Sequence, residues 1–265
     1  MRFAIIGSPR TGSSHLVTLL GSHPEILCNG NVFHPKNVWV FWPKKDLTEE
    51  TRSELLELRR RDPEALLDRV FASSYGREHV GFKIFQGQND RILDRLIADR
   101  NIRKIVLYRR NVLANYASSL AAKRSGDWGG KAEGRLEENP KVSFDENKFM
   151  VFHDAYVEFY RDIINRLNDK NQVFHLTYYE DINNPLLFGT LLRFIGVAGD
   201  ASPASVKVHH VKQNPSDILS RFANFPTVLE FLRTHGLLHW LHEGETSLVS
   251  LGDCVRNHRA EPVFG

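Results

Sequence analysis

Cysteine is scarce in this chain. Only two cysteines, Cys28 and Cys254, occur among its 265 residues. They could form at most one bridge, so the sequence excludes a scaffold held together by several disulfides. We therefore expect a reducing compartment and a fold stabilised by a hydrophobic core, for which the chain is long enough.

Long apolar runs and a large net charge are also missing. No uninterrupted run of about 18 apolar residues occurs, so we expect no membrane-spanning helix. The N-terminus lacks a basic segment followed by a long apolar stretch, which argues against a secretory signal. The formal net charge is only +3, which suits an anionic ligand and gives little support for nucleic acid as a partner, so we expect none. These features predict a cytoplasmic protein.

The most informative stretch that is present lies at the N-terminus. The mostly apolar residues 2–6 predict a buried strand, the turn GSPRTG follows at 7–12, and an amphipathic helix is expected from Ser13. In such a strand–loop–helix, loop amides and the first helical N–H groups point into one space, and the helix dipole adds partial positive charge. The motif therefore predicts an anion-binding loop, with a tight turn that binds nothing as the alternative.

This loop resembles the phosphate-binding pattern G-x-x-x-x-G-K-[ST], but Ser13 stands where that pattern has lysine. Positive charge beside an anion must then come from elsewhere, and Arg10 within the loop is the first candidate. Lys83, a charged residue in the apolar segment GFKIF, is the second. We expect Lys83 at the exposed end of its strand, where a lysine that merely reaches solvent is the alternative.

A second stretch, at 105–122, combines a strand, a basic turn and a helix. The strand ends in Arg109-Arg110, and Ser118 lies eight residues after Arg110. Ligands of an open parallel sheet collect at the carboxyl ends of its strands, where Arg110 would offer a planar charged fork and Ser118 a hydroxyl. Solvated arginines and a small packing serine are the alternative.

Strand and helix signals alternate up to residue 197. The alternation predicts an α/β, three-layer, P-loop-like fold with a central parallel sheet of about four to five strands flanked by helices. Residues 198–265 show helical pieces without a clear strand. We expect one domain over 1–265, with a core at 1–197 and a C-terminal helical segment at 198–265. Strands are expected at 2–6, 79–85, 102–108 and 172–178.

Local signals also mark the ends of several elements. Thr48 and the pair Asp62-Pro63 are expected to begin helices, and Gly196 is expected to end one. The short apolar piece at 25–28 runs into Asn29-Gly30-Asn31, which predicts a turn.

Taken together, the two basic stretches resemble the sulfotransferase family that uses 3′-phosphoadenosine 5′-phosphosulfate (PAPS). The loop matches the family's x-P-[KR]-[ST]-G-[ST]-[ST], and Arg110-Asn111 with Ser118 matches its second element. The segments YYEDI at 178–182 and FIGV at 194–197 are similar to two further family segments. The loop and the SHP at 22–24 are most similar to bacterial carbohydrate sulfotransferases, the Nod-factor type among them.

The resemblance implies a role for each of these residues. PAPS would be the co-substrate, with its 5′-phosphosulfate on the loop and its 3′-phosphate on Arg110, Ser118 and, in a later basic segment, Lys212. Arg10 and Lys83 would stabilise charge on the leaving oxygen, without a metal ion. The acceptor would be a hydroxyl of a carbohydrate or glycolipid. The loop residues concerned are Arg10, Thr11, Gly12, Ser13 and Ser14.

The general base departs from the family's pattern. Phe85 and Asn31 stand at the two positions where family members carry a histidine or a glutamate, and neither can take a proton. His34 is the nearest titratable side chain on the same loop, and its ordinary pKa near 6.5 suits a base at neutral pH. A histidine that hydrogen-bonds the backbone is the alternative.

Other interpretations remain open at this point. The aromatic residues Trp39, Phe41 and Trp42 could stack on a sugar or pack in the core. A P-loop kinase or NTPase is disfavoured by Ser13 and by the absence of a strand that ends in Asp for Mg²⁺. A nucleotide-binding protein with little or no catalysis is the third class, since both usual base positions are lost. The sequence does not predict the oligomeric state.

Overall fold

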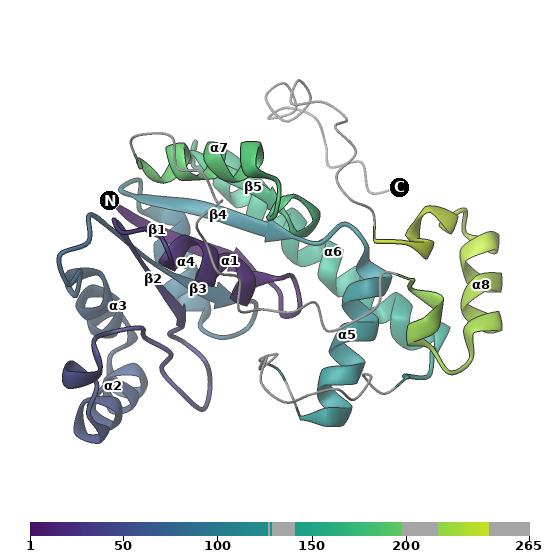
Figure 1. The fold of residues 1–265 in the computed structure, drawn as a ribbon, viewed down its shortest axis with the longest axis horizontal. Helices are drawn as coiled ribbons and strands as arrows, with labels where there is room; N and C mark the ends of the chain where they lie inside the picture. Colours follow the sequence, from purple (N-terminus) through teal and green to yellow (C-terminus); the bar gives the residue numbers. More distant parts are fainter. Residues whose placement is uncertain (127, 129–140, 198–216, 244–265) are drawn as a thin grey trace. The chain divides into compact units, whose positions relative to one another are not determined.

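The computed structural model of this chain describes residues 1–126, 128, 141–197 and 217–243. Two compact units are present (Figure 1), and each is interrupted in sequence. Unit 1 comprises Met1–Tyr108 and Asn165–His209, and unit 2 comprises Arg109–Ile164 and His210–Gly265. The single-domain organisation stays a prediction. In the part of the chain described, no helix is both long and apolar enough to cross a membrane.

Unit 1 is built on a parallel sheet whose strand order is β2-β3-β1-β4-β5. The α/β prediction with a central parallel sheet is therefore confirmed. β1 lies at the centre, between β3 and β4, so the loop after it emerges where the strand order reverses. The strands are β1 (Arg2–Gly7), β2 (Ile26–Asn31), β3 (His79–Phe85), β4 (Ile102–Tyr108) and β5 (Phe174–Tyr178).

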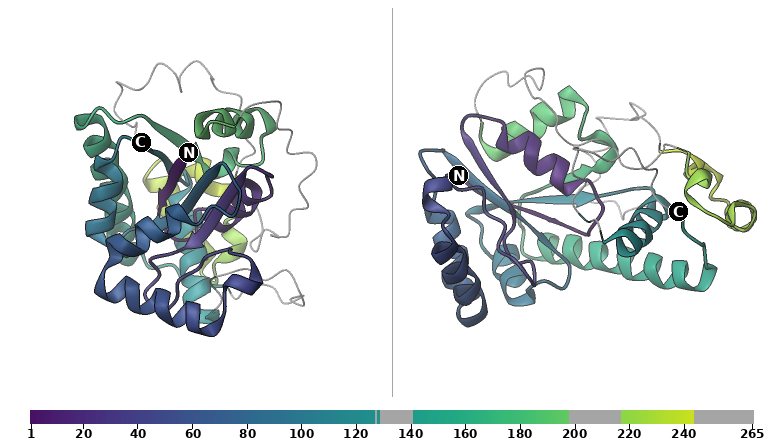
Figure 2. Two further views of the ribbon diagram at one scale, coloured as in Figure 1. Left: turned by 90° about the vertical axis from the view of Figure 1, so that its left-hand side faces the viewer. Right: turned by 60° about the horizontal axis from the view of Figure 1, so that its bottom comes forward.

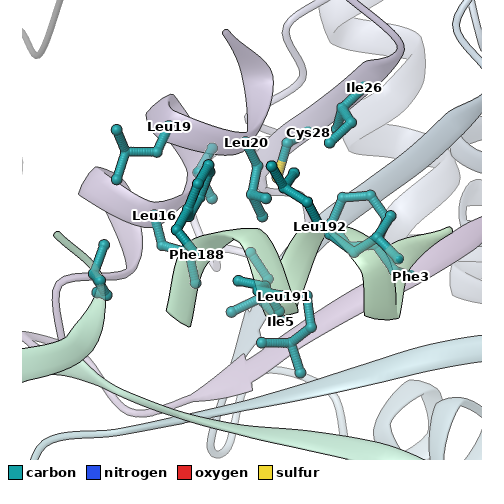
Figure 3. Packing of buried hydrophobic residues seen from close by; sticks show 14 of the residues in the cluster. Phe3, Ile5, Leu16, Leu19, Leu20, Ile26, Cys28, Phe188, Leu191 and Leu192 are labelled. Atoms are coloured by element: carbon teal, nitrogen blue, oxygen red, sulfur yellow. The ribbon is translucent and has the colours of Figure 1, made fainter. Parts of the chain in front are cut away.

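Helices cover both faces of this sheet (Figures 1 and 2). α1 and α7 bury leucines and Phe188 against Phe3, Ile5 and Ile105 in one apolar cluster (Figure 3). The opposite face carries Phe82, whose ring centroid lies 5.5 Å from that of Phe71 on α3. The helices of unit 1 are α1 (Ser13–Gly21), α2 (Glu49–Arg61), α3 (Pro63–Ala72), α4 (Asp90–Ala98) and α7 (Pro185–Ile195), with short 3-10 turns η1 (Lys44–Asp46) and η2 (Tyr179–Asp181).

The predicted helix ends are where the sequence places them. The Thr48 hydroxyl accepts a hydrogen bond from the Thr51 N–H at 3.2 Å, and the Asp62 carboxylate accepts one from Ala65 N–H at 3.0 Å. These caps satisfy donors that the first helical turn leaves without a partner. Gly196 ends α7 at φ +105, a conformation that suits glycine.

The turn expected at Asn29–Asn31 is wrong, because β2 continues to Asn31. Its pairing with β3 shifts register between Cys28 and Asn31. The Asn29 side chain bridges this irregularity, since its amide donates to the Gly81 carbonyl at 3.3 Å and its carbonyl accepts from Phe41 N–H at 2.9 Å. Side-chain hydrogen bonds thus hold a turn-prone sequence in the edge strand.

Unit 2 is helical and rich in aromatic residues. Phe144, Phe149 and Phe231 form a cluster with ring centroids 5.2–5.7 Å apart. The helical pieces predicted near the C-terminus are confirmed where the chain is described. The elements are α5 (Val112–Ser125), α6 (Glu146–Asp169, whose last turn belongs to unit 1), α8 (Phe225–Thr234) and the 3-10 turns η4 (Leu219–Arg221) and η5 (Leu238–Leu241).

Candidate active site

The loop between β1 and α1 is a tight turn. Two of its residues, Arg10 and Gly12, have positive φ angles of 66° and 76°. The buried Thr11 hydroxyl donates to the Ser8 carbonyl at 2.7 Å and so closes the turn. Gly12 precedes α1 and has no side chain with which to cap it, so no side-chain oxygen competes with an anion at the start of this helix.

Gly12 is required here for a second reason. A Cβ at this position would lie 2.5 Å from Cδ2 of Tyr179, inside any normal contact distance. Tyr179 belongs to the YYEDI segment after β5, so the structure brings together two segments on which the family resemblance rests. His15 Nε2 and Asn183 Oδ1 lie 2.6 Å apart and join α1 to the same region.

Lys83 is buried beneath this loop, and the expectation that it lies at an exposed strand end is wrong. Lys83 is only 8% exposed to solvent. The ammonium donates to the Ser14 hydroxyl at 2.8 Å and to that of Ser13 at 3.3 Å. The cause is the pleat of the sheet: Lys83 pairs in register with Ile5, so its side chain is on the face that α1 covers.

The electrostatics of Lys83 suit an anion site. Burial is the main cause that lowers the pKa of Lys83 to about 8, and the charge of Arg10 adds to it. The ammonium also lies 5.2 Å from the centroid of the Phe85 ring. Ser13, which replaces the lysine of the P-loop pattern, thus contacts a lysine that comes from the neighbouring strand. An anion on the loop would relieve the unfavourable burial of this charge.

Asn31 lies at the end of β2, opposite Lys83 in the strand register. Its residue is 5% exposed, and its side-chain carbonyl oxygen has no hydrogen-bond partner among the residues described. The main-chain carbonyl accepts from the N–H groups of His34 and Trp39, both at 3.3 Å. These two hydrogen bonds fold the loop at 32–39 back onto the end of β2.

His34 is half-buried in that loop. Its Nδ1 accepts a hydrogen bond from the Lys36 N–H at 3.2 Å, so the neutral ring carries its proton on Nε2. Burial, followed by the charges of Arg59, Lys36 and Lys83, lowers the pKa of His34 below its usual value. Arg59 on α2 also donates to the main-chain carbonyls of His34 and Pro35. To accept a proton at Nε2, the ring must adopt the other tautomer and give up the bond to Lys36.

The aromatic residues that follow fall into two groups. Trp42 is buried and packs on Tyr75, with ring centroids 5.8 Å apart. Trp39 and Phe41 are 48% and 54% exposed. Core packing therefore accounts for Trp42, whereas the other two rings offer open faces.

The second basic stretch belongs to unit 2. Asn111 caps α5, because its side-chain carbonyl accepts from Ala114 N–H at 2.9 Å. Arg109 is buried in an ion pair with Glu243, which also binds Arg221 at 2.8 Å. Burial alone would raise the pKa of Glu243, but the two arginines hold it at about 2. Arg109 is thus a structural cation, whereas Arg110 is exposed.

Ser118 is buried on α5, and Lys212 lies outside the described residues. The loop at 7–12 and Lys83 belong to unit 1, whereas Arg110 and Ser118 belong to unit 2. Sequence reasoning missed Glu243 and Arg59. Neither lies in a recognisable motif, and both act on residues far away in the chain.

The sequence relatives found by comparison with known proteins are described as Nodulation protein H. No protein-family model matches the chain. Nodulation protein H from Rhizobium tropici is 28% identical over 198 residues, which cover 73% of this chain and 75% of that protein. Nodulation protein H from Rhizobium meliloti is 26% identical over 198 residues, with 73% and 76% coverage. The Nodulation protein H of strain 1021 of that species is 31% identical over 129 residues, which span 48% of this chain and 49% of that protein.

Solved structures that match this chain include two sulfotransferases. A sulfotransferase from Alicyclobacillus acidocaldarius has a TM-score of 0.49 and 19% identity, with 90% of this chain and 98% of that one covered. The sulfotransferase domain of the Synechococcus PCC 7002 olefin synthase has a TM-score of 0.43 and 16% identity, with 97% and 92% covered.

Proposed function

We propose that this chain is a sulfotransferase that transfers a sulfuryl group from PAPS to a hydroxyl of a carbohydrate or glycolipid. Its sequence relatives include Nodulation protein H of two Rhizobium species. The observation that carries the proposal is the buried Lys83, whose ammonium bonds the Ser13 and Ser14 hydroxyls at the start of α1. A charge of this kind under an anion loop supports the binding of a phosphosulfate.

In this reaction the loop would stabilise negative charge on the leaving group. The acceptor oxygen attacks sulfur in line, the bond from sulfur to the phosphate oxygen breaks, and adenosine 3′,5′-bisphosphate leaves with that electron pair. Negative charge grows on the leaving oxygen, where Arg10, Lys83 and the amides of residues 11–14 would stabilise it. Such preorganised charge is worth most in a buried site.

The 3′-phosphate is assigned to the second basic stretch. Arg110 is exposed beside the N-terminus of α5, where the helix dipole favours an anion. A guanidinium there can bond two phosphate oxygens at once. The family pattern adds Ser118 and Lys212 to the contacts of this phosphate.

The proposed acceptor side is formed by residues 31–41, which comprise the end of β2 and the segment after it. Trp39 and Phe41 present half-exposed rings, which supports a sugar as the acceptor. His34 is the proposed general base, in the tautomer that frees Nε2. The unpartnered carbonyl oxygen of Asn31 can orient the acceptor hydroxyl by accepting its hydrogen bond.

Nucleotide discrimination tests the donor side. Calorimetric titration with adenosine 3′,5′-bisphosphate and with ATP·Mg²⁺ should show a clear preference for the bisphosphate. Lys83→Met should weaken that binding. Lys104→Met is the matched control, because Lys104 is also a buried lysine but bonds Gln172 at 2.6 Å on the opposite face of the sheet. Preference for ATP would contradict the proposal and favour a P-loop kinase or NTPase.

A cytoplasmic location belongs to the same proposal. It is supported by the free, buried thiol of Cys28 and by the low cysteine content of the chain.

A further inference from the structure

Three side chains with metal-binding groups meet at the other end of the sheet, where the strands begin. Glu25 precedes β2, Glu78 precedes β3, and His79 is the first residue of β3. The main chain fixes their positions, because the N–H groups of Glu78 and His79 both donate to the Glu25 carbonyl at 3.0 Å. All strands of a parallel sheet run in the same direction, so this end of the sheet is opposite the end that carries the loop between β1 and α1.

The atoms that face one another here are all electron-pair donors. One ring nitrogen of His79 and one carboxylate oxygen each from Glu25 and Glu78 lie within 4.8 Å of one another. His79 Nε2 and Glu25 Oε2 are 3.8 Å apart, which is too far for a hydrogen bond. Two carboxylates and an imidazole thus converge without a hydrogen bond between them.

His79 gives the independent sign that a ligand is missing. The residue is only 5% exposed, and neither of its ring nitrogens has a hydrogen-bond partner in the described structure. Buried polar groups without partners are rare in native proteins. A neutral imidazole has one ring nitrogen with a lone pair that can bind a cation.

We propose that Glu25, Glu78 and His79 bind a divalent ion of the zinc type, with water in the remaining coordination positions. A single imidazole with two carboxylates suits zinc, whereas an all-oxygen site would suit calcium or magnesium. Bonds of about 2.0–2.2 Å place tetrahedral ligands roughly 3.4 Å apart. Glu78 is exposed and the Glu25 side chain is 37% exposed, so both carboxylates can close that distance while His79 stays fixed.

His23 is close by but is not a ligand. Its Nδ1 accepts a hydrogen bond from the Glu25 N–H at 3.3 Å, so the neutral ring carries its proton on Nε2. The α-ammonium of Met1 donates to the Glu78 carbonyl at 2.5 Å, and its positive charge acts against the binding of a metal ion. The bound ion would join the segments that lead into β2 and β3.

Zinc chloride alone is the probe, on full-length protein without an affinity tag and after removal of metal with a chelator. Competition with a chromophoric chelator should show one bound zinc ion. Saturating zinc, at about 100 times its Kd, should raise the melting temperature by roughly 5 °C or more, whereas magnesium should not. No zinc binding, or equal stabilisation by magnesium, would overturn the proposal.

Two variants locate the site. Glu78→Gln and His79→Gln should each lower zinc affinity by more than about 10-fold, the loss that even indirect changes to a metal site cause. Glu78 is exposed, so its variant tests the site even if His79→Gln does not fold. His153→Gln is the matched control, because His153 pairs with a single carboxylate, Asp154, at 3.0 Å. Unchanged zinc affinity in Glu78→Gln, or an equal loss in His153→Gln, would place the ion elsewhere and overturn the assignment.

Discussion

Replacing Lys83 by methionine should stabilise the ligand-free protein while it weakens nucleotide binding. The pKa of Lys83 falls from 10.5 to about 8 on folding, and that shift corresponds to about 3 kcal/mol at neutral pH. Loss of the 2.8 Å hydrogen bond to Ser14 offsets about 1 kcal/mol of this gain. Lys83→Met should therefore raise the free energy of unfolding by about 2 kcal/mol at pH 7, or the melting temperature by about 4–8 °C.

The pH dependence of stability tests a second time whether Lys83→Met stabilises the protein. Because the folded-state pKa of Lys83 is the lower one, the unfolded chain binds more protons between pH 8 and pH 10.5. Wild-type stability from this group is therefore lowest below pH 8 and recovers as the pH rises through that window. Near pH 9.5 the advantage of Lys83→Met should fall below about 1 kcal/mol.

Urea denaturation at the two pH values measures this directly, and calorimetry with adenosine 3′,5′-bisphosphate measures the loss of binding. A variant that is less stable than wild type at both pH values, with unchanged nucleotide affinity, would refute the reasoning. Lys83 would then be a structural hydrogen-bond donor and not a charge held for an anion.

Three further substitutions test other parts of the account. Gly12→Ala should destabilise the protein more than Gly76→Ala, because both residues have φ near +80° but only at Gly12 would a Cβ collide with Tyr179. The backbone cost that both variants share is about 1–2 kcal/mol. Equal urea midpoints of the two variants would contradict the close contact. Arg110→Ala should reduce the preference for adenosine 3′,5′-bisphosphate over adenosine 5′-phosphate by about 10- to 100-fold, and an unchanged preference in calorimetry would remove Arg110 from the 3′-phosphate. His34→Ala should lower turnover by roughly 10²–10⁴-fold. In the wild type, kcat/KM should decline with falling pH only below pH 6.5, since the pKa of His34 is lowered; normal turnover of the variant would exclude His34 as the base.

Features determined by nearby residues could be predicted from the sequence. The tight turn between β1 and α1, the caps at Thr48 and Asp62 and the glycine end of α7 each depend on a few consecutive residues. The alternation of strands and helices likewise predicted a parallel sheet, because each pattern reports how one segment buries its own apolar face.

Features determined by distant residues could not be predicted. A lysine in an apolar strand gives no sign of the helix that will cover it, so the burial of Lys83 became evident only from the packing of α1. Arg109 and Arg110 are adjacent and alike in sequence. Only Glu243, which lies 134 residues after Arg109, separates their roles.

The irregular end of β2 has the same origin. Asn29-Gly30-Asn31 is turn-prone by composition, yet the Asn29 side chain holds it in the sheet through Gly81 and Phe41. These partners lie 52 and 12 residues away. Local propensity was overridden by contacts that the local sequence does not contain.

Transfer of label from PAPS that carries radioactive sulfur, across a panel of carbohydrate and glycolipid acceptors, tests the central claim most directly. The account predicts a labelled acceptor formed in equal amount with adenosine 3′,5′-bisphosphate, and a large loss of this activity in Lys83→Met but not in Lys104→Met. Tight binding of the bisphosphate with no transfer to any acceptor would contradict it and leave a protein that binds the nucleotide without catalysis.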